Sequence, residues 1–293
     1  MWRKTLFFIL LAYNWSAQAI EVTDARDQKV VLAQPALRII SLAPHVTEML
    51  FAAGAGSQVV GVVKYSDYPE QAQQLPLVGG YTKVDVEAVL ALKPDLVVAW
   101  LSGNKGDAVQ QLAGFGIPVY YTEPRHLEAI ATDIRQLGLL AGTSQEADAE
   151  ADRLLAEISQ LRSEYQGRAK VKVFYQIWDR PMMTVNGEHL INEVITLCGG
   201  ENVFAALPVL TPKVGVEPVL DAAPEAIIAS GMATERPEWL DDWRKWPALP
   251  AVQTGSLFSL QPSIIQRQGP RILIGARQIC QLLDDVRQTP TQR

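Results

Sequence analysis

The feature that most constrains the fold of this chain is an internal repeat at a constant offset of 130 residues. The segment 86–99 reads VEAVLALKPDLVVA, and the segment 216–229 reads VEPVLDAAPEAIIA. Each copy predicts a short helix, a turn made by proline and an acidic residue, and a buried strand. A unit repeated at this distance predicts two lobes of similar architecture.

The segment between the two copies has the pattern of one long helix. It contains no glycine or proline from 144 to 166, Thr143 and Glu146 form a capping-box pattern, and Gly167 provides a stop. Apolar residues recur at helical spacing at Ala147, Ala151, Leu154, Leu155, Ile158 and Leu161. A helix of about 23 residues is roughly 35 Å long, enough to connect two lobes stiffly. The alternative is one more helix packed on a single sheet.

Short β-branched runs alternate with helical patterns along the rest of the chain. This predicts an α/β fold with largely parallel strands. The predicted strands are 38–42, 59–63, 96–100, 119–121, 171–177, 226–229 and 257–260. A length of 293 residues suits two domains of ordinary size.

The N-terminus has the pattern of a secretory signal peptide. Arg3 and Lys4 precede an apolar stretch over 6–13, and Ala17 and Ala19 form a small-residue cleavage motif. The alternative is an uncleaved anchor, but the apolar stretch is far short of the roughly 20 residues that span a bilayer. We expect cleavage after Ala19 and a periplasmic location. The predicted division is a signal peptide at 1–19, an N-terminal lobe at 20–142, a connecting helix at 143–167 and a C-terminal lobe at 168–293, with a disordered tail at 285–293.

Charge and cysteine content narrow the possible functions further. The chain has 26 basic and 32 acidic residues, a formal net charge of -6, and no cluster of Lys and Arg, which excludes nucleic acid as a probable partner class. Cys198 and Cys280 are the two cysteines, and in an oxidising compartment we expect them to pair. The alternative is two separately buried thiols.

Catalytic and metal-binding motifs are missing from the sequence. It has no nucleophile elbow, phosphate-binding loop or zinc-protease motif, and its three histidines lie in separate segments. Aromatic and polar residues instead follow the predicted strands, where α/β sheets hold ligands. They are Tyr65, Tyr68, Tyr81, Trp100 and Trp178, the polar run 263–267, and Arg271. This pattern favours a flat-walled cleft for a large planar ligand over packing between the lobes.

His45 follows the first strand of this predicted arrangement. Helix capping or surface exposure is one interpretation. The other is axial ligation of a metal in a bound macrocycle, because a neutral imidazole is a good transition-metal ligand. No dedicated metal site is predicted.

Glu87 and Glu217 occupy the same first-turn position in the two copies of the repeat. Complementing the helix dipole explains them without any partner. Two carboxylates at corresponding points of two linked lobes are also natural contacts for a two-fold symmetric, basic partner.

Five segments, in order, resemble the vitamin B12-binding periplasmic proteins of ABC importers. These belong to the helical-backbone metal-receptor class, also called class III periplasmic binding proteins. The segments are 39–48, 65–69, 86–97, 198–202 and 270–271. The resemblance covers about residues 37–283. It implies an α/β fold of two Rossmann-like lobes joined by one long rigid helix, with a corrinoid held between them and little closure on binding.

The resemblance also implies partners and site residues. Glu87 and Glu217 match the residues that dock on the two transmembrane subunits of the permease, which works with a cytoplasmic ATPase, and the family's disulfide matches Cys198 and Cys280. Tyr65 matches a ligand-contacting tyrosine, and Tyr81 stands where other members have tryptophan. The remaining ligand-binding positions that match the family are Met183, Ser263, Gln266 and Arg267. Trp100 joins this predicted set because it lies at the end of a strand.

The sequence therefore predicts a monomeric periplasmic solute-binding protein that captures vitamin B12 or a related corrinoid and delivers it to an ABC permease. It predicts no enzyme activity and no cofactor besides the transported ligand. A haem-binding or iron–siderophore-binding protein of the same class is the first alternative. A secreted enzyme on the same two-lobe scaffold is the second, which catalytic residues in the cleft would distinguish.

Overall fold

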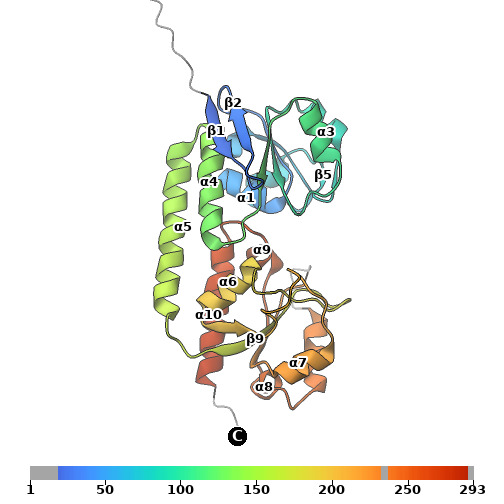
Figure 1. The fold of residues 1–293 in the computed structure, drawn as a ribbon, viewed down its shortest axis with the longest axis vertical. Helices are drawn as coiled ribbons and strands as arrows, with labels where there is room; N and C mark the ends of the chain where they lie inside the picture. The colour runs from blue at the N-terminus through green and yellow to red at the C-terminus, as the bar shows by residue number, and fades with distance from the viewer. Residues whose placement is uncertain (1–18, 232–236, 290–293) are drawn as a thin grey trace, which may run out of the picture.

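The protein is described by a computed structural model over residues 19–231 and 237–289 (Figure 1). The predicted signal peptide lies outside the described residues except for Ala19, and so do residues 290–293 of the predicted tail. No helix in these two ranges is long and apolar enough to cross a membrane.

The N-terminal lobe contains a four-stranded parallel sheet in the order β4-β3-β7-β8. Its strands are β3 (Ile39–Ser41), β4 (Val59–Val62), β7 (Leu96–Trp100) and β8 (Val119–Thr122). Two antiparallel hairpins complete the lobe, namely β1 (Ile20–Thr23) with β2 (Lys29–Leu32) and β5 (Gly79–Gly80) with β6 (Lys83–Val84). The runs of Val, Ile and Leu in β3 and β7 are buried because helices cover both faces of a parallel sheet.

The C-terminal lobe repeats this topology in a second parallel sheet, in the order β10-β9-β11-β12. Its strands are β9 (Val171–Gln176), β10 (Gly200–Asn202), β11 (Ala226–Ala229) and β12 (Leu257–Ser259). In both lobes the first strand of the sheet lies between the second and the third. All seven predicted strands are present, and β10 was missed because its three residues have no β-branched or aromatic side chain.

Helices surround the two sheets, and two of these helices belong to the repeated segments. They are α1 (Pro44–Ala52), α2 (Val86–Ala91), α3 (Ala108–Gly114), α4 (Leu127–Ala141), α5 (Ser144–Tyr165), α6 (Leu190–Leu197), α7 (Val216–Ala222), α8 (Pro250–Gln253), α9 (Pro262–Ile265) and α10 (Ile272–Gln288), with 3-10 turns at Gly56–Gln58, Glu70–Gln74 and Glu238–Lys245. The two copies found in the sequence are α2 followed by β7 and α7 followed by β11. The internal repeat therefore corresponds to the same step in two lobes of equal topology.

The long connecting helix is α5, which runs beside both lobes in Figure 1. It packs on α4 and also contacts α6 and α10. Arg162 forms ion pairs with Glu128 of α4 and Glu193 of α6. The predicted capping box is wrong, because the Thr143 hydroxyl donates to the backbone oxygen of Ala53 instead of capping α5.

One hydrophobic core is shared by the two lobes. It includes Met49 of α1, Ile134 of α4, Ile158 of α5 and Ile279 of α10, all of them buried. Because α5 contributes to a core that continues from one sheet to the other, the lobes are held by packed side chains in addition to the chain connections.

The predicted disordered tail from Asp285 is wrong as far as residue 288. These residues are the last turn of α10, and the Arg287 guanidinium donates to the backbone oxygens of Ala169 (2.8 Å) and Cys198 (2.7 Å). The polar sequence of this turn reflects its exposed face and not a lack of order.

Candidate functional site

Two of the aromatic residues predicted to contact ligand lie together in the N-terminal lobe. Trp100 ends β7, and its ring centroid is 5.9 Å from that of Tyr81. The Asn104 amide nitrogen donates to the backbone oxygens of Leu42 (2.8 Å) and Tyr81 (2.7 Å), and its Oδ1 accepts from the backbone N–H of Trp100 at 2.6 Å. The loops after β3 and β7 are thus joined at the carboxyl edge of the sheet. In α/β folds, ligands bind at this edge, at the point where the connections from neighbouring strands run to opposite sides of the sheet.

Tyr65 lies near this pair and is presented to solvent. Tyr65 is 70% exposed, and its backbone φ of 69° lies in the left-handed region. Such a conformation is sparsely populated and is kept only where neighbouring contacts fix it. Tyr65 and Tyr81 border one surface hollow of about 680 Å³, together with Lys64 and Glu87.

The predicted residues of the C-terminal lobe are less closely grouped. The Gln266 amide donates to the Ser230 backbone oxygen at 2.6 Å and to its hydroxyl at 2.8 Å, so this side chain is turned into its own lobe. Met183 pairs through its backbone with Trp178, and Ser263 lies half-buried on α9. Within the described residues, no hydrogen bond or ring contact joins Met183 or Ser263 to the aromatic residues of the N-terminal lobe.

Arg267 joins the two lobes through a cluster of ion pairs. Its Nη1 is 3.0 Å from Glu48 Oε1 and 2.6 Å from Asp67 Oδ1, and its Nη2 is 3.1 Å from Asp67 Oδ2. The same Nη2 donates to the backbone oxygen of Tyr65 at 3.0 Å. Arg267 is thus a predicted C-terminal residue that the structure brings directly to a predicted N-terminal one, Tyr65.

Arg271 extends this cluster. Its guanidinium contacts both carboxylate oxygens of Glu48, at 3.0 and 2.6 Å, and lies 4.2 Å from the ring centroid of Tyr68. Only 1% of the Glu48 side chain is exposed, so this carboxylate depends on the two arginines for its solvation. Glu48 and Asp67 were missed as individual residues by the sequence analysis, although both lie within segments that carry the family resemblance.

The charges in this cluster affect one another. Partial burial opposes ionisation of Asp67, but the hydrogen bonds and charge of Arg267 hold the pKa of this carboxyl below its ordinary value. Burial alone would lower the pKa of Arg267, yet its bonds to Asp67 and Glu48 raise it. Asp67 and Arg267 are therefore both ionised at neutral pH.

His45 is buried against Trp100, and neither helix capping nor surface exposure describes it. The rings are 5.1 Å apart and perpendicular, His45 is 3% exposed, and α1 begins after Ala43 with no side-chain cap. Burial, together with the charge of Arg267, lowers the pKa of His45 to about 3, so the imidazole is neutral. Its Nε2 has no hydrogen-bond partner within the described part of the chain. Axial ligation by this nitrogen remains a prediction.

The two first-turn glutamates occupy equivalent places in the lobes. Glu87 is in the first turn of α2 and Glu217 in the first turn of α7, and both are exposed. The Asp85 side chain caps α2 by accepting from the Ala88 N–H at 3.0 Å. Since α2 already has this cap, Glu87 is not needed to complete the helix terminus.

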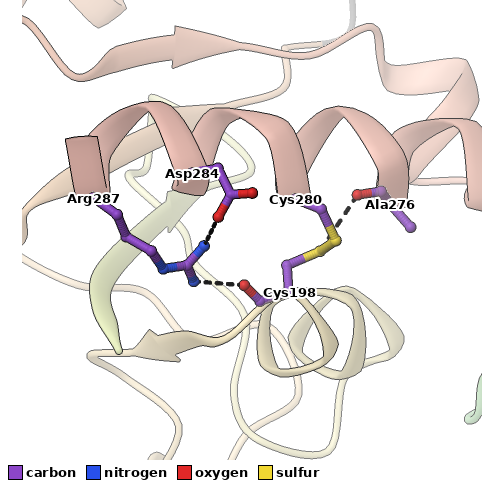
Figure 2. The surroundings of a disulfide bond; sticks show 5 residues. All are labelled: Cys198, Ala276, Cys280, Asp284 and Arg287. Carbon is purple, nitrogen blue, oxygen red and sulfur yellow. Dashed lines mark hydrogen bonds and ion pairs between the residues drawn. A yellow bond between two sulfur atoms is a disulfide. The ribbon is translucent and has the colours of Figure 1, made fainter. Parts of the chain in front are cut away.

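The two cysteines form a disulfide that joins α10 to the end of α6. Figure 2 shows Cys198 and Cys280 with the neighbouring side chain of Arg287, which also bonds Asp284 at 2.6 Å. No group of three or more His, Cys, Asp or Glu in the described ranges could hold a metal ion.

The chain belongs to the periplasmic binding protein family, whose model matches residues 39–264. It is 38% identical over 254 residues to the vitamin B12-binding protein of Vibrio campbellii, a match that covers 87% of this chain and 92% of the relative. It is 37% identical over the same length to the vitamin B12-binding protein of Yersinia pestis, covering 87% and 89%.

Solved structures of periplasmic binding proteins have the same fold as this chain. The periplasmic vitamin B12 binding protein BtuF of Vibrio cholerae superposes with a TM-score of 0.79 at 35% identity, covering 87% of this chain and 99% of that one. The periplasmic heme-binding protein RhuT from Roseiflexus sp. RS-1 superposes with a TM-score of 0.77 at 25% identity, covering 86% and 99%. The two-lobe α/β architecture joined by one long helix is thus confirmed.

Proposed function

We propose that this protein is a periplasmic solute-binding protein that captures vitamin B12 or a closely related corrinoid between its lobes. The observation that carries the proposal is the grouping of Tyr65, Tyr81 and Trp100 at the carboxyl edge of the N-terminal sheet, with Arg267 of the other lobe bonded to Tyr65. Flat aromatic surface with a few polar groups suits a large planar ligand. Relatives named as vitamin B12-binding proteins, 37–38% identical over most of the chain, support the same ligand class.

In this proposal the two lobes contribute differently to the ligand site. Tyr65, Tyr81 and Trp100 provide the aromatic wall, and Arg267 reaches it from the C-terminal lobe. Met183, Ser263 and Gln266 are the further ligand-binding positions proposed in that lobe. The core shared by both lobes limits closure, so the cleft is largely pre-formed and the cost of ordering it on binding is small. The protein works as a monomer, without enzyme activity or a cofactor of its own. The signal peptide is cleaved after Ala19 on export.

Calorimetric titration of the mature protein tests the ligand. Cyanocobalamin, cobinamide, haemin and a ferric siderophore are titrated separately, and we expect cyanocobalamin to bind with a Kd below about 1 μM, or about -8 kcal/mol. If only haemin or only the siderophore binds, the proposed transport function stands and that compound replaces the corrinoid as the proposed ligand. No heat with any of the four would contradict the proposed function.

We also propose that Glu87 and Glu217 dock the protein on the two transmembrane subunits of an ABC permease. The double variant Glu87→Lys, Glu217→Lys is expected to weaken docking at least about 100-fold, because two carboxylates facing basic groups become repulsive lysines. Its affinity for cyanocobalamin should stay within about 2-fold, since both glutamates are exposed and an exposed charge contributes little. Docking is measured by pull-down and by surface plasmon resonance on permease in nanodiscs.

A matched control separates docking from net charge. Glu188 and Glu201 are also exposed, and neither lies in the first turn of α2 or α7. The double variant Glu188→Lys, Glu201→Lys changes the net charge equally and is expected to dock like the unmodified protein. Equal loss of docking in both double variants would show a general charge effect and would remove the special role of Glu87 and Glu217.

A further inference from the structure

Arg267 is held by two carboxylates of very different exposure. The side chain of Glu48 is 1% exposed, whereas that of Asp67 is 54% exposed, and Arg267 itself is 15% exposed. A buried carboxylate cannot leave its arginines without a large desolvation cost, but an exposed one exchanges readily with water. Glu48 is therefore the permanent partner of Arg267, and Asp67 is the partner that can be replaced.

The charges of the cluster balance only while Asp67 is in place. Glu48 and Asp67 carry two negative charges, and Arg267 and Arg271 carry two positive ones. If the Asp67 carboxylate turns to solvent, the remaining three groups have a net charge of +1, and two guanidinium donors of Arg267 lose their acceptor. Another anionic oxygen group would restore both the charge balance and the hydrogen bonds.

A surface hollow lies against the Asp67 side of this cluster. It has a volume of about 420 Å³ and is bordered by Lys64, Tyr65, Ser66, Asp67 and residues of the following turn. Lys64 is exposed and makes no ion pair or side-chain hydrogen bond with any residue that the structure describes. A group entering the hollow would meet the Asp67 carboxylate with one unpaired lysine beside it.

We propose that Arg267 and Lys64 form an anion subsite of the ligand cleft, which Asp67 occupies in the free protein and from which an anionic oxygen group of the ligand displaces it. This inference rests on the proposed function. A complete cobalamin carries one phosphodiester, in the loop that bears its lower base, whereas cobinamide has the same corrin amides without that phosphate. The subsite thus selects complete corrinoids over truncated ones. In haem, the propionates would supply the same anionic oxygens.

Two single variants test the subsite by calorimetric titration with cyanocobalamin and with dicyanocobinamide. In Asp67→Asn the internal competitor loses its charge, so we expect cyanocobalamin to bind about 2- to 5-fold more tightly, the effect of one exposed ion pair. In Lys64→Gln we expect cyanocobalamin to bind about 2- to 5-fold more weakly. Dicyanocobinamide should bind with unchanged affinity in both variants, because it presents no anion to the subsite.

If Lys64→Gln binds cyanocobalamin as tightly as the unmodified protein, Lys64 is not part of the subsite and the proposal as stated is rejected. Asp107→Asn makes the same chemical change as Asp67→Asn at an exposed residue of the same lobe outside the cluster, and it should leave both affinities unchanged. If Asp67→Asn binds cyanocobalamin equally or more weakly, or if both ligands change by the same factor, Asp67 is a structural residue and the subsite is rejected. If the unmodified protein binds haemin and no corrinoid, tighter haemin binding by Asp67→Asn supports the anion subsite while the corrinoid proposal fails. If no ligand binds, the proposed function fails and the inference falls with it.

Discussion

Replacing Glu48 by glutamine is expected to lower the free energy of unfolding by about 3–5 kcal/mol, measured by urea denaturation at pH 7. The carboxylate is almost fully buried and accepts from both Arg267 and Arg271. Glutamine keeps the shape of the side chain but removes its charge. The variant thus leaves two guanidinium groups, each 15% exposed, without their shared counter-ion. Arg267 keeps Asp67 as a partner, whereas Arg271 has no other carboxylate partner among the described residues. The loss therefore arises mainly from Arg271 left unpaired and does not measure the net value of the ion pairs.

An exposed ion pair is the matched control for this prediction. Asp242 bonds Lys245 at 2.6 Å, and their side chains are 50% and 67% exposed. The Asp242→Asn variant removes one carboxylate charge, as Glu48→Gln does, and is expected to cost less than about 1 kcal/mol because water replaces the lost partner. Equal, small losses in the two variants would show that water reaches Arg267 and Arg271 and would contradict the burial argument.

The consequences of the Glu48 variant extend beyond stability. Glu48 belongs to α1 of the N-terminal lobe, and both of its arginines belong to the C-terminal lobe. The lobes therefore meet through a buried ionic contact as well as through the shared core. A weakened contact at this point would allow the lobes more relative motion, and it would also leave Arg267 less well oriented for a ligand.

Much of the architecture was predictable because the repeat couples a helical pattern to a buried strand in both halves of the chain. Strands β7 and β11 are continuous apolar runs that follow a turn of proline and an acidic residue, so their type and place were clear. Strand β10 has the sequence Gly-Glu-Asn, which carries no strand signal of its own. It forms because it pairs with β9, a tertiary interaction that local sequence does not encode.

The site was predictable as a set of residue types but not in its contacts. Gln266 and Arg267 are neighbours in sequence, yet the Gln266 amide bonds Ser230 of its own lobe while Arg267 reaches Glu48, 219 positions away. That difference follows from how α9 ends and where the lobes meet, which only the folded chain determines. His45 shows the same limit, because its burial depends on Trp100 and on a loop of the other lobe that packs near it.

Removing the disulfide is expected to lower the free energy of unfolding by about 4 kcal/mol in the double variant Cys198→Ser, Cys280→Ser. The bond closes a loop with a sequence separation of 82 residues, and without it the unfolded chain gains the corresponding conformational entropy. Serine avoids a free thiol and is close to cysteine in size. Urea denaturation of the double variant and of the unmodified protein measures the difference, and reduction of the unmodified protein with dithiothreitol provides a second route without substitution.

Arg287 allows the covalent contribution to be separated from the local hydrogen bonds. Its guanidinium bonds the Cys198 backbone oxygen and Asp284, so it holds α10 to the same place as the disulfide does. The Arg287→Gln variant is expected to cost about 1.5–3 kcal/mol, the range for hydrogen bonds to a charged group. If the loop argument is correct, the cysteine variant loses more stability than Arg287→Gln, and the combined variant loses more than either one, because one change acts on the unfolded chain and the other on the folded state. A combined loss no larger than that of Arg287→Gln alone would mean that the disulfide does not constrain the unfolded chain.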